Sequence, residues 1–285
     1  MYRYRRPVRL GDHRLMLRPR DSHDLRLIET NLKLSPSATI RWSHDVFGNS
    51  IAVASFTEPT TELRIESRLR LETFAQKRLA FQITAEAETY PFIYSADDRI
   101  DLGRLLDRQY PDPTDRVASW ARGFVRSNPT NTLALLADLN SGVGAWISYQ
   151  SRETEGTQTP VETLHRRWGS CRDLAVLFIE AARCLGFGAR VVSGYLYNPL
   201  SVASGAGTTH AWADIYVPGS GWTAYDPTNG TIDSSDLIRV AVTRDISQAI
   251  PVAGSFVGAS DSYLGMTVDV TVTPERSGAR KSAVR

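Results

Sequence analysis

Residues 169–186 read Gly-Ser-Cys-Arg-Asp-Leu-Ala-Val-Leu-Phe-Ile-Glu-Ala-Ala-Arg-Cys-Leu-Gly, and this stretch decides the fold. Its apolar residues recur at helical spacing, which predicts a helix with one buried face. Ser170 is a good N-cap residue and Gly186 a good stop signal, so we expect the helix to cover about 171–185. Cys171 then lies in the first turn, where unpaired N–H groups and the helix dipole favour thiolate over thiol.

Three strands are predicted after this helix, at 189–197, 209–217 and 221–226. His210 lies near the start of the second strand, and Asp226 ends the third. The turn between these two strands is tight, so their residues can become neighbours in an antiparallel hairpin. We therefore expect an α+β core in which a helix packs on an antiparallel sheet.

Cys171, His210 and Asp226 supply a thiol, an imidazole and a carboxylate in that order. A thiol attacks only as thiolate, so a base must take its proton and must itself be held in one tautomer. Each residue also has a plainer interpretation: a small buried cysteine, a structural histidine, and a turn-forming aspartate before Pro227. The order and placement of all three together favour a catalytic triad. Cys184, late on the apolar face of the helix, fits the buried interpretation.

The composition limits the classes of function that need to be considered. The chain has 285 residues, 42% of them hydrophobic, and a formal net charge of +2, which argues against wholesale disorder and against a nucleic-acid-binding surface. The opening residues lack a signal-peptide core, and no apolar run approaches a membrane span. The two cysteines, on one helix, would lie about 20 Å apart, too far for a disulfide. These patterns predict a cytoplasmic protein that does not bind membranes.

The sequence pattern also predicts how the chain is divided into regions. Residues 62–71 alternate between apolar and charged side chains, as a half-buried strand does, and 115–126 have the apolar spacing of a helix. The predicted regions are an N-terminal β-sandwich-like domain at 1–90, a linker at 91–113, the catalytic core at 114–250, a C-terminal strand segment at 251–275 and a disordered tail at 276–285.

Several blocks of sequence together resemble one known family, the bacterial transglutaminase-like superfamily, a group described as predicted cysteine proteases. The blocks in the core are Gly169–Leu174, Ala182–Tyr195, His210–Asp214, Gly221–Trp222 and Asp226–Thr228. The run Tyr4–Arg20, with Asp45–Asn49, resembles the β-rich region that precedes this domain in many members, and Arg244–Asp245 with Pro251–Gly254 resembles the segment that follows it. One departure is visible: Gly-Phe-Gly-Ala-Arg at 186–190 replaces the family's usual Gly-Ile-Pro-Ala-Arg.

The resemblance implies a papain-like, transglutaminase-like core and assigns roles to its residues. Cys171 would be the nucleophile, His210 the general base and then acid, and Asp226 the residue that orients the histidine. The backbone N–H of Cys171 would donate to the oxyanion. Four further residues are candidates for lining the site or completing the oxyanion hole: Trp146, Gly169, Ser170 and Trp212. Gly169 in particular is expected to let substrate backbone approach closely.

The expected function is acyl transfer from a peptide or carboxamide bond through a thioester on Cys171. Hydrolysis is favoured over cross-linking, because the resemblance is to protease-like members. We expect a protein or peptide substrate, no cofactor and no metal, since Cys171 with His165 and His210 lacks the paired close ligands of a zinc site. Two alternatives stay open: a catalytically silent scaffold with the same fold, and an acyl transferase that uses a thioester cofactor. Substrate identity and oligomeric state are left open by the sequence.

Overall fold

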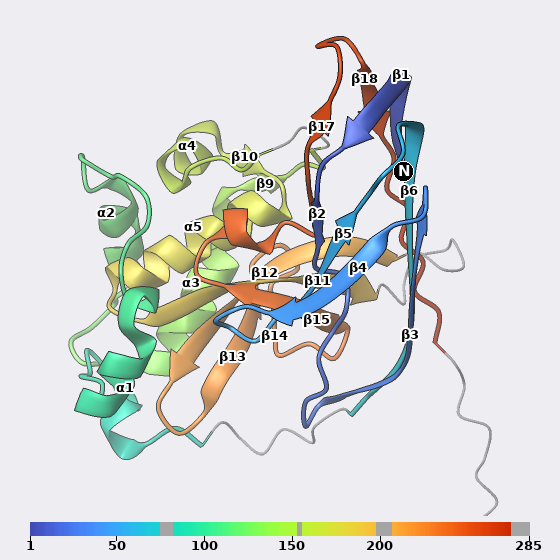
Figure 1. Ribbon diagram of the computed structural model, residues 1–285. Coiled ribbons are helices and arrows are strands. Elements are labelled where there is room, and N and C mark those ends of the chain that lie inside the picture. The colour runs from blue at the N-terminus through green and yellow to red at the C-terminus, as the bar shows by residue number, and fades with distance from the viewer. Residues whose placement is uncertain (75–81, 153–155, 198–206, 275–285) are drawn as a thin grey trace, which may run out of the picture.

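The computed structural model describes residues 1–74, 82–152, 156–197 and 207–274 (Figure 1). These residues form an N-terminal β region, on the right of the view, and a mixed core of helices and sheet on the left. The predicted tail at 276–285, and most of the Gly- and Ser-rich loop at 201–208, lie outside the described residues.

The core is built on one long helix, α5 (Cys171–Cys184), packed against an antiparallel sheet of five strands. The strand order is β14-β13-β12-β11-β15. The bounds of the strands are β11 Gly188–Tyr197, β12 Gly207–Val217, β13 Gly221–Asp226, β14 Thr231–Ile232 and β15 Leu237–Thr243. The predicted helix on an antiparallel sheet is confirmed, and its start at Cys171 is the predicted one.

Alternation along β12 gives each face of this sheet a different neighbour. Ala211, Ala213 and Ile215 belong to the large apolar cluster that also holds Phe178 of α5. Trp212 belongs to a separate cluster with β11, β13 and β15. Each large apolar side chain buried in this way contributes about 1.5–3 kcal/mol. The apolar face of α5 therefore fixes the end of the helix that carries Cys171 against the sheet.

Three other helices pack against α5. They are α2 Arg116–Arg122, α3 Thr132–Trp146 and α4 Pro160–Arg166. The predicted helix at 115–126 is shorter in the structure, because the chain tightens into turns at Gly123. The minor elements of the core are η1 Ala85–Ala87, β7 Thr89–Tyr90, β8 Thr130–Asn131, β9 Ser148–Tyr149, β10 Trp168–Gly169 and η3 Ile246–Ala249.

The segment predicted as a linker carries structure of its own. It contains α1 (Ala96–Leu102) and η2 (Gly103–Leu105) and packs on the core sheet. The Tyr94 hydroxyl donates to the backbone oxygen of Tyr216 at 2.8 Å and accepts from the N–H of Gly188 at 3.0 Å. α1 has only seven residues, which is too short for its apolar spacing to be recognised in a segment that also contains Pro91 and Pro111. The sequence did not predict this helix, and the domain boundaries, including the linker at 91–113, stay predictions.

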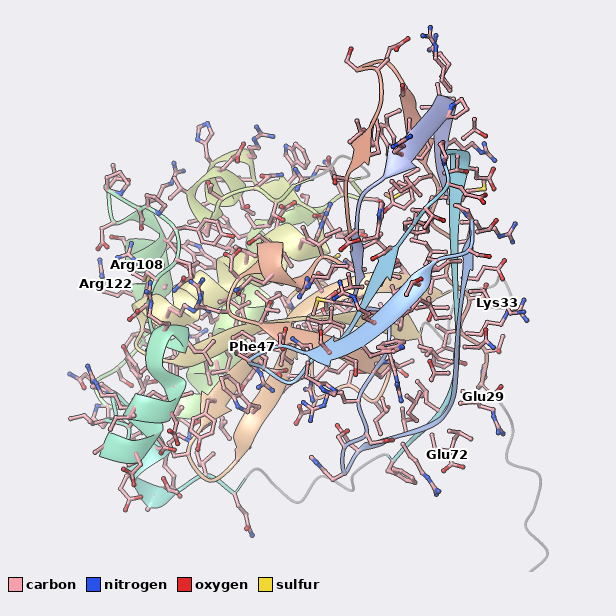
Figure 2. All side chains as sticks on the ribbon, in the orientation of Figure 1. Glu29, Lys33, Phe47, Glu72, Arg108 and Arg122 are labelled. Atoms are coloured by element: carbon pink, nitrogen blue, oxygen red, sulfur yellow. The ribbon has the colours of Figure 1, made fainter. Side chains whose placement is uncertain are left out.

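The N-terminal region is two antiparallel sheets whose apolar faces meet. The first has the order β17-β1-β6-β3, with β18 also on β1, and the second has the order β16-β2-β5-β4. Leu15 and Ala54 of the second sheet share a cluster with Leu32 and Ile65 of the first, which makes a sandwich. Figure 2 shows Glu29, Lys33 and Glu72 pointing outward from β3 and β6. The strand bounds are β1 Tyr2–Leu10, β2 His13–Leu15, β3 Leu25–Ser35, β4 Thr39–His44, β5 Ser50–Ser55 and β6 Thr60–Thr73.

The C-terminal strands return to this sandwich and join it to the core. β16 (Val252–Ala253) pairs with β2, while β17 (Phe256–Val257) and β18 (Tyr263–Met266) pair with β1. Asn49, after β4, exchanges two hydrogen bonds with the backbone of Val242 in β15, at 2.7 and 2.9 Å. The two ends of the chain therefore complete one sandwich beside the catalytic core.

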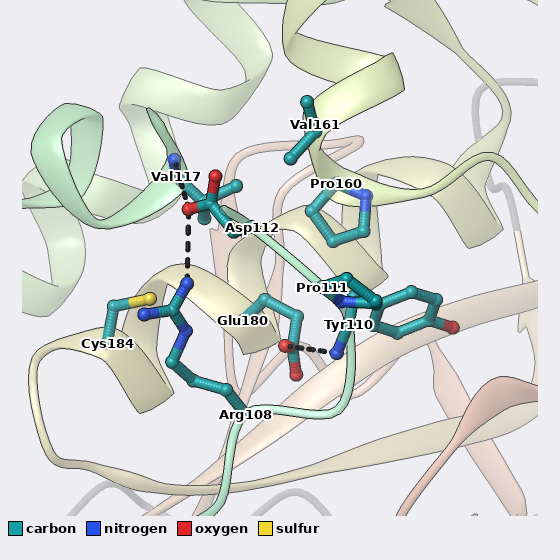
Figure 3. Close-up of a pocket in the computed structure, with 9 residues that line it drawn as sticks. All are labelled: Arg108, Tyr110, Pro111, Asp112, Val117, Pro160, Val161, Glu180 and Cys184. Atoms are coloured by element: carbon teal, nitrogen blue, oxygen red, sulfur yellow. Dashed lines mark hydrogen bonds and ion pairs between the residues drawn. The ribbon is translucent and has the colours of Figure 1, made fainter. Parts of the chain in front are cut away.

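The end of α5 opposite Cys171 is an anchor for the chain that precedes α2 (Figure 3). Glu180 accepts from the backbone N–H groups of Gln109 and Tyr110, and it forms a buried ion pair with Arg183 at 2.7 Å. Figure 2 shows Arg108 beside Arg122, and both bind Asp115.

Cys184 lies at this anchored end of the helix and is half-buried. Burial raises the pKa of its thiol to about 11. Cys184 is therefore an unreactive thiol in the same helix as Cys171.

Candidate active site

Cys171 is the first residue of α5 and is half-buried. As the first helical residue, it has a backbone N–H without an acceptor inside the helix. The chain reaches it through β10, which pairs in parallel with β9 in the register Trp168–Ser148 and Gly169–Tyr149. Cys171 is therefore held between a helix and a short two-stranded bridge.

The Cys171 sulfur lies against the hairpin of β11 and β12. The His210 side chain and the backbone N–H of Ala211 both act on this sulfur. Burial raises the pKa of the Cys171 thiol, but the His210 ring, the Ala211 N–H and the nearby charge of Arg172 together outweigh it and leave the pKa below its ordinary value. The site therefore stabilises thiolate.

His210 connects the sulfur to a carboxylate. Its Nε2 lies 2.8 Å from Oδ2 of Asp226, and both side chains are buried. With Nε2–H donating to the carboxylate, Nδ1 is the ring nitrogen left for the sulfur. Burial lowers the pKa of His210, but the hydrogen bonds to Asp226 and Cys171 outweigh it and raise the pKa to about 9. Both shifts favour thiolate and imidazolium over the neutral pair, and the two groups titrate as one coupled unit.

Asp226 is fixed by the turn that follows β13. Its Oδ1 accepts from the backbone N–H of Thr228 at 3.0 Å and of Asn229 at 3.3 Å, and Oδ2 accepts from the Asn229 amide at 2.7 Å. Burial raises the pKa of Asp226, but His210 and Asn229 outweigh it and lower the pKa overall. Asn229 was missed by the sequence reading, although Asp-Pro-Thr-Asn-Gly at 226–230 is a turn in which such bonds are common.

Gly169 and Ser170 adjoin Cys171 but face into the protein. Both the N–H and the hydroxyl of Ser170 donate to Asp173 at 2.8 Å, and the other oxygen of Asp173 binds Arg152 at 2.9 Å. A Cβ added at Gly169 would lie 2.8 Å from that of Asp173. The expectation that Gly169 gives room to substrate is therefore wrong: the glycine gives room to the buried Asp173 side chain.

The two candidate tryptophans have different positions. Trp212 is buried and its ring is stacked on His210, with ring centroids 6.1 Å apart, so it limits the space in which the imidazole can turn. Trp146 lies at the end of α3 and is 47% exposed, with the Arg167 guanidinium 4.6 Å from its ring centroid.

Tyr149 on β9 is a neighbour of Cys171 that the sequence reading did not identify. Tyr149 pairs with Gly169, two residues before Cys171, and burial and then the charge of Cys171 raise the pKa of its phenol. Its ring is 54% exposed, so it borders both the nucleophile and the solvent. Tyr149 is hard to identify from the sequence, because residues 146–149 are compatible with either a strand or the start of a helix. Its place also depends on the pairing of β9 with β10, which are distant in the sequence.

Alkylation of the two cysteines should separate them by pH. Because the pKa of Cys171 is lowered and that of Cys184 is raised to about 11, the thiolate of Cys171 persists to lower pH than that of Cys184. Iodoacetamide at pH 6.5 should therefore label Cys171 selectively, with Cys184 as the internal control, measured by peptide mass spectrometry. Turnover should also fall as the pH rises through about 9, where His210 loses the proton it donates. Equal labelling of both thiols near pH 8.5 would contradict the ion pair.

Within the described residues, no three His, Cys, Asp or Glu side chains gather as metal ligands would. The same part of the chain contains no helix that is both long and apolar enough to cross a membrane.

Two family models match the chain. The model of the bacterial transglutaminase-like N-terminal region matches residues 1–72, and that of the transglutaminase-like superfamily matches residues 118–227. An uncharacterized protein of Mycobacterium tuberculosis is 28% identical over 282 residues, covering 94% of this chain and 89% of the relative. One of Mycobacterium leprae is 26% identical over 278 residues, covering 95% of each chain.

A solved structure shares the fold. A candidate cysteine protease from Cytophaga hutchinsonii superposes with a TM-score of 0.66 at 19% identity, covering 96% of each chain. That match extends over both the sandwich and the core. The two family models show that the chain carries the bacterial transglutaminase-like N-terminal region at residues 1–72 and belongs, through residues 118–227, to the transglutaminase-like superfamily.

Proposed function

We propose that the protein is a cysteine-dependent enzyme that cleaves peptide or carboxamide bonds through a thioester on Cys171. One observation carries the proposal: the Cys171 sulfur at the start of α5 interacts with the His210 ring, whose Nε2 lies 2.8 Å from Oδ2 of Asp226. A structural cysteine has no need of a buried ion pair at a helix start, whereas a nucleophile does.

The geometry supports an acyl-transfer sequence in two halves. The Cys171 thiolate attacks the carbonyl carbon, and the imidazolium of His210 gives its proton to the leaving nitrogen as the C–N bond breaks. The neutral ring then takes a proton from water, the hydroxide oxygen attacks the thioester carbon, and the C–S bond breaks to give the acid and the thiolate. Asp226 keeps Nε2 protonated throughout and so holds Nδ1 toward the reacting atoms.

We assign stabilisation of the oxyanion to two donors, the backbone N–H of Cys171 and the hydroxyl of Tyr149. The first has no acceptor within α5, and the second belongs to β9, which pairs Tyr149 with Gly169 two residues before the sulfur. Tyr149 takes this role in preference to Trp146, whose ring faces the Arg167 guanidinium.

Replacing Tyr149 by phenylalanine tests this assignment. The loss of one oxyanion donor should lower kcat by about 100-fold and leave KM nearly unchanged. The rate of Cys171 alkylation should change little, since the thiolate does not depend on this donor. Tyr263→Phe, another half-exposed tyrosine on β18, is the matched control and should keep full turnover. An unchanged kcat in Tyr149→Phe would remove Tyr149 from the mechanism.

We further propose hydrolysis rather than cross-linking as the main outcome. The solvent exposure of Tyr149 supports it, because water reaches the nucleophile without an acceptor protein, and so does the description of the Cytophaga hutchinsonii neighbour as a candidate cysteine protease. A turnover assay with a labelled primary amine present in millimolar amounts decides the question. Predominant formation of the free acid supports hydrolysis, and predominant amide formation supports cross-linking.

The cytoplasm is the proposed location, with a protein or peptide as substrate. A nucleophile that works as thiolate must stay reduced, and the two free thiols at opposite ends of α5 are too far apart to protect each other as a disulfide. Fractionation of cells with an antibody to the protein tests this location. Recovery from an oxidising extracytoplasmic fraction would contradict it.

A further inference from the structure

We propose that Trp146 and Arg167 form a subsite beside Cys171 that binds a carboxylate on the substrate, so that the enzyme prefers an acidic residue near the bond it cleaves. This inference rests on the proposed function and names the class of substrate.

The first observation is the distribution of charge around the nucleophile. Between His165 and Cys171 the chain has two arginines and no acidic residue, and Arg172 follows directly. The nearby acidic residues within the described chain are already paired: Glu162 with Arg166 at 2.6 Å, and buried Asp173 with Arg152. The chain as a whole has a net charge of only +2, so this positive charge is local.

The second observation is the position of Arg167. It ends α4 with a positive φ of 58°, and its guanidinium lies over the exposed ring of Trp146 at 4.6 Å. Across the described residues, no carboxylate lies within ion-pair distance of this side chain. A guanidinium that is stacked on an indole ring keeps its edge N–H groups free and fixed in direction, which suits bidentate binding of a carboxylate.

The third observation is proximity to the reacting atom. β10 carries the chain from Arg167 to Cys171 in four residues, which limits their separation to about 14 Å. The Ser148 N–H donates to the backbone oxygen of Arg167 at 2.9 Å, so β9, the strand that carries Tyr149, holds the backbone of Arg167 in place. Arg172 lies close enough for its charge to act on the Cys171 thiolate. An acidic side chain within about four residues of the reacting carbonyl can reach the stacked guanidinium.

Two alkylating reagents test the charge without requiring turnover. Iodoacetate is anionic and iodoacetamide is neutral. The rate of Cys171 labelling by iodoacetate divided by the rate by iodoacetamide therefore reports the local electrostatic potential. We expect this ratio to exceed that of glutathione, to fall about twofold in Arg167→Gln at low salt, and to fall in the wild type when salt is added. Arg104→Gln, which removes an exposed arginine near the far end of α5, should leave the ratio unchanged. A ratio equal to that of glutathione, or unchanged in Arg167→Gln, overturns the subsite.

Protection by peptides tests recognition. The probes are two acetylated hexapeptides with a central glutamine, one with glutamate two residues away and one with lysine in that place. The glutamate peptide should slow iodoacetamide labelling of Cys171 at concentrations at least fivefold lower than the lysine peptide needs. This preference should disappear in Arg167→Gln and persist in Arg104→Gln. Equal protection by both peptides, or a preference that survives in Arg167→Gln, overturns the proposal.

The two proposals can fail separately. Both readouts follow labelling of the thiol and need no product, so an inactive protein can still show the charge preference. Conversely, an active protein without that preference keeps the proposed function and loses only the subsite. Circular dichroism of each variant confirms that it has folded.

Discussion

Replacing Cys171 by alanine should abolish turnover and remove the acyl-enzyme, with a fall of roughly 10⁴-fold or more, because no other group in the site can form the thioester. The side chain is small and only half-buried at the edge of the main apolar cluster, so the variant should fold. The measurement is turnover on a quenched fluorescent peptide library.

Cys184→Ala is the control for this experiment. It removes the other thiol of α5, whose pKa is raised to about 11, and should keep full activity. Loss of activity in Cys184→Ala alone would place the chemistry elsewhere, and unchanged turnover in Cys171→Ala would exclude the proposed nucleophile.

Asp226→Asn is the second change with a large expected effect. Asparagine keeps the carbonyl oxygen that accepts from Thr228 and Asn229, so the turn should survive, but the negative charge facing His210 is lost. The imidazolium is then less stable, the pKa of His210 falls, and the thiolate loses its partner. We expect kcat to fall by about 10²–10⁴-fold.

A second readout separates this effect from simple unfolding. Because the ion pair weakens, labelling of Cys171 by iodoacetamide at pH 6.5 should slow, and its pH profile should move upward. Asp101→Asn, on the exposed surface of α1, removes the same charge away from the site and should change neither readout. Wild-type kinetics in a folded Asp226→Asn variant would show that the carboxylate does not act on the histidine.

The parts of the structure that the sequence predicted are those set by local patterns. The helix at 171–184 follows from its apolar spacing and its cap, and the strands that carry His210 and Asp226 follow from alternation and from the tight turn at 218–221. These patterns also bring the three reacting groups within reach of one another. The fold class and the family were therefore predictable from residues close together in the chain.

The remaining features depend on contacts between distant segments. Tyr149 reaches the site only because β9 pairs with β10, a bridge of two residues on each strand. The place of Gly169 against Asp173, and the stacking of Arg167 on Trp146, depend likewise on how loops cross. Two-residue strands and single ring contacts leave no periodic signal in a sequence.

For a related reason, the sequence did not predict the short helix α1, and it did not predict which strands pair with the C-terminal strands. α1 has seven residues, too few for a recognisable apolar stripe, and its docking depends on Tyr94 and Leu102. β16, β17 and β18 pair with the first strands of the chain, more than 200 residues away. Pairing at that separation is fixed by the tertiary fold rather than by the strands themselves.

Intact-mass spectrometry after brief exposure to a library of peptides and amides, quenched in acid, tests the central claim most directly. The account predicts a mass increase equal to one acyl group, mapped to Cys171 by peptide digestion and absent from Cys171→Ala. Turnover without any adduct on Cys171, or an adduct that persists in Cys171→Ala, would contradict it.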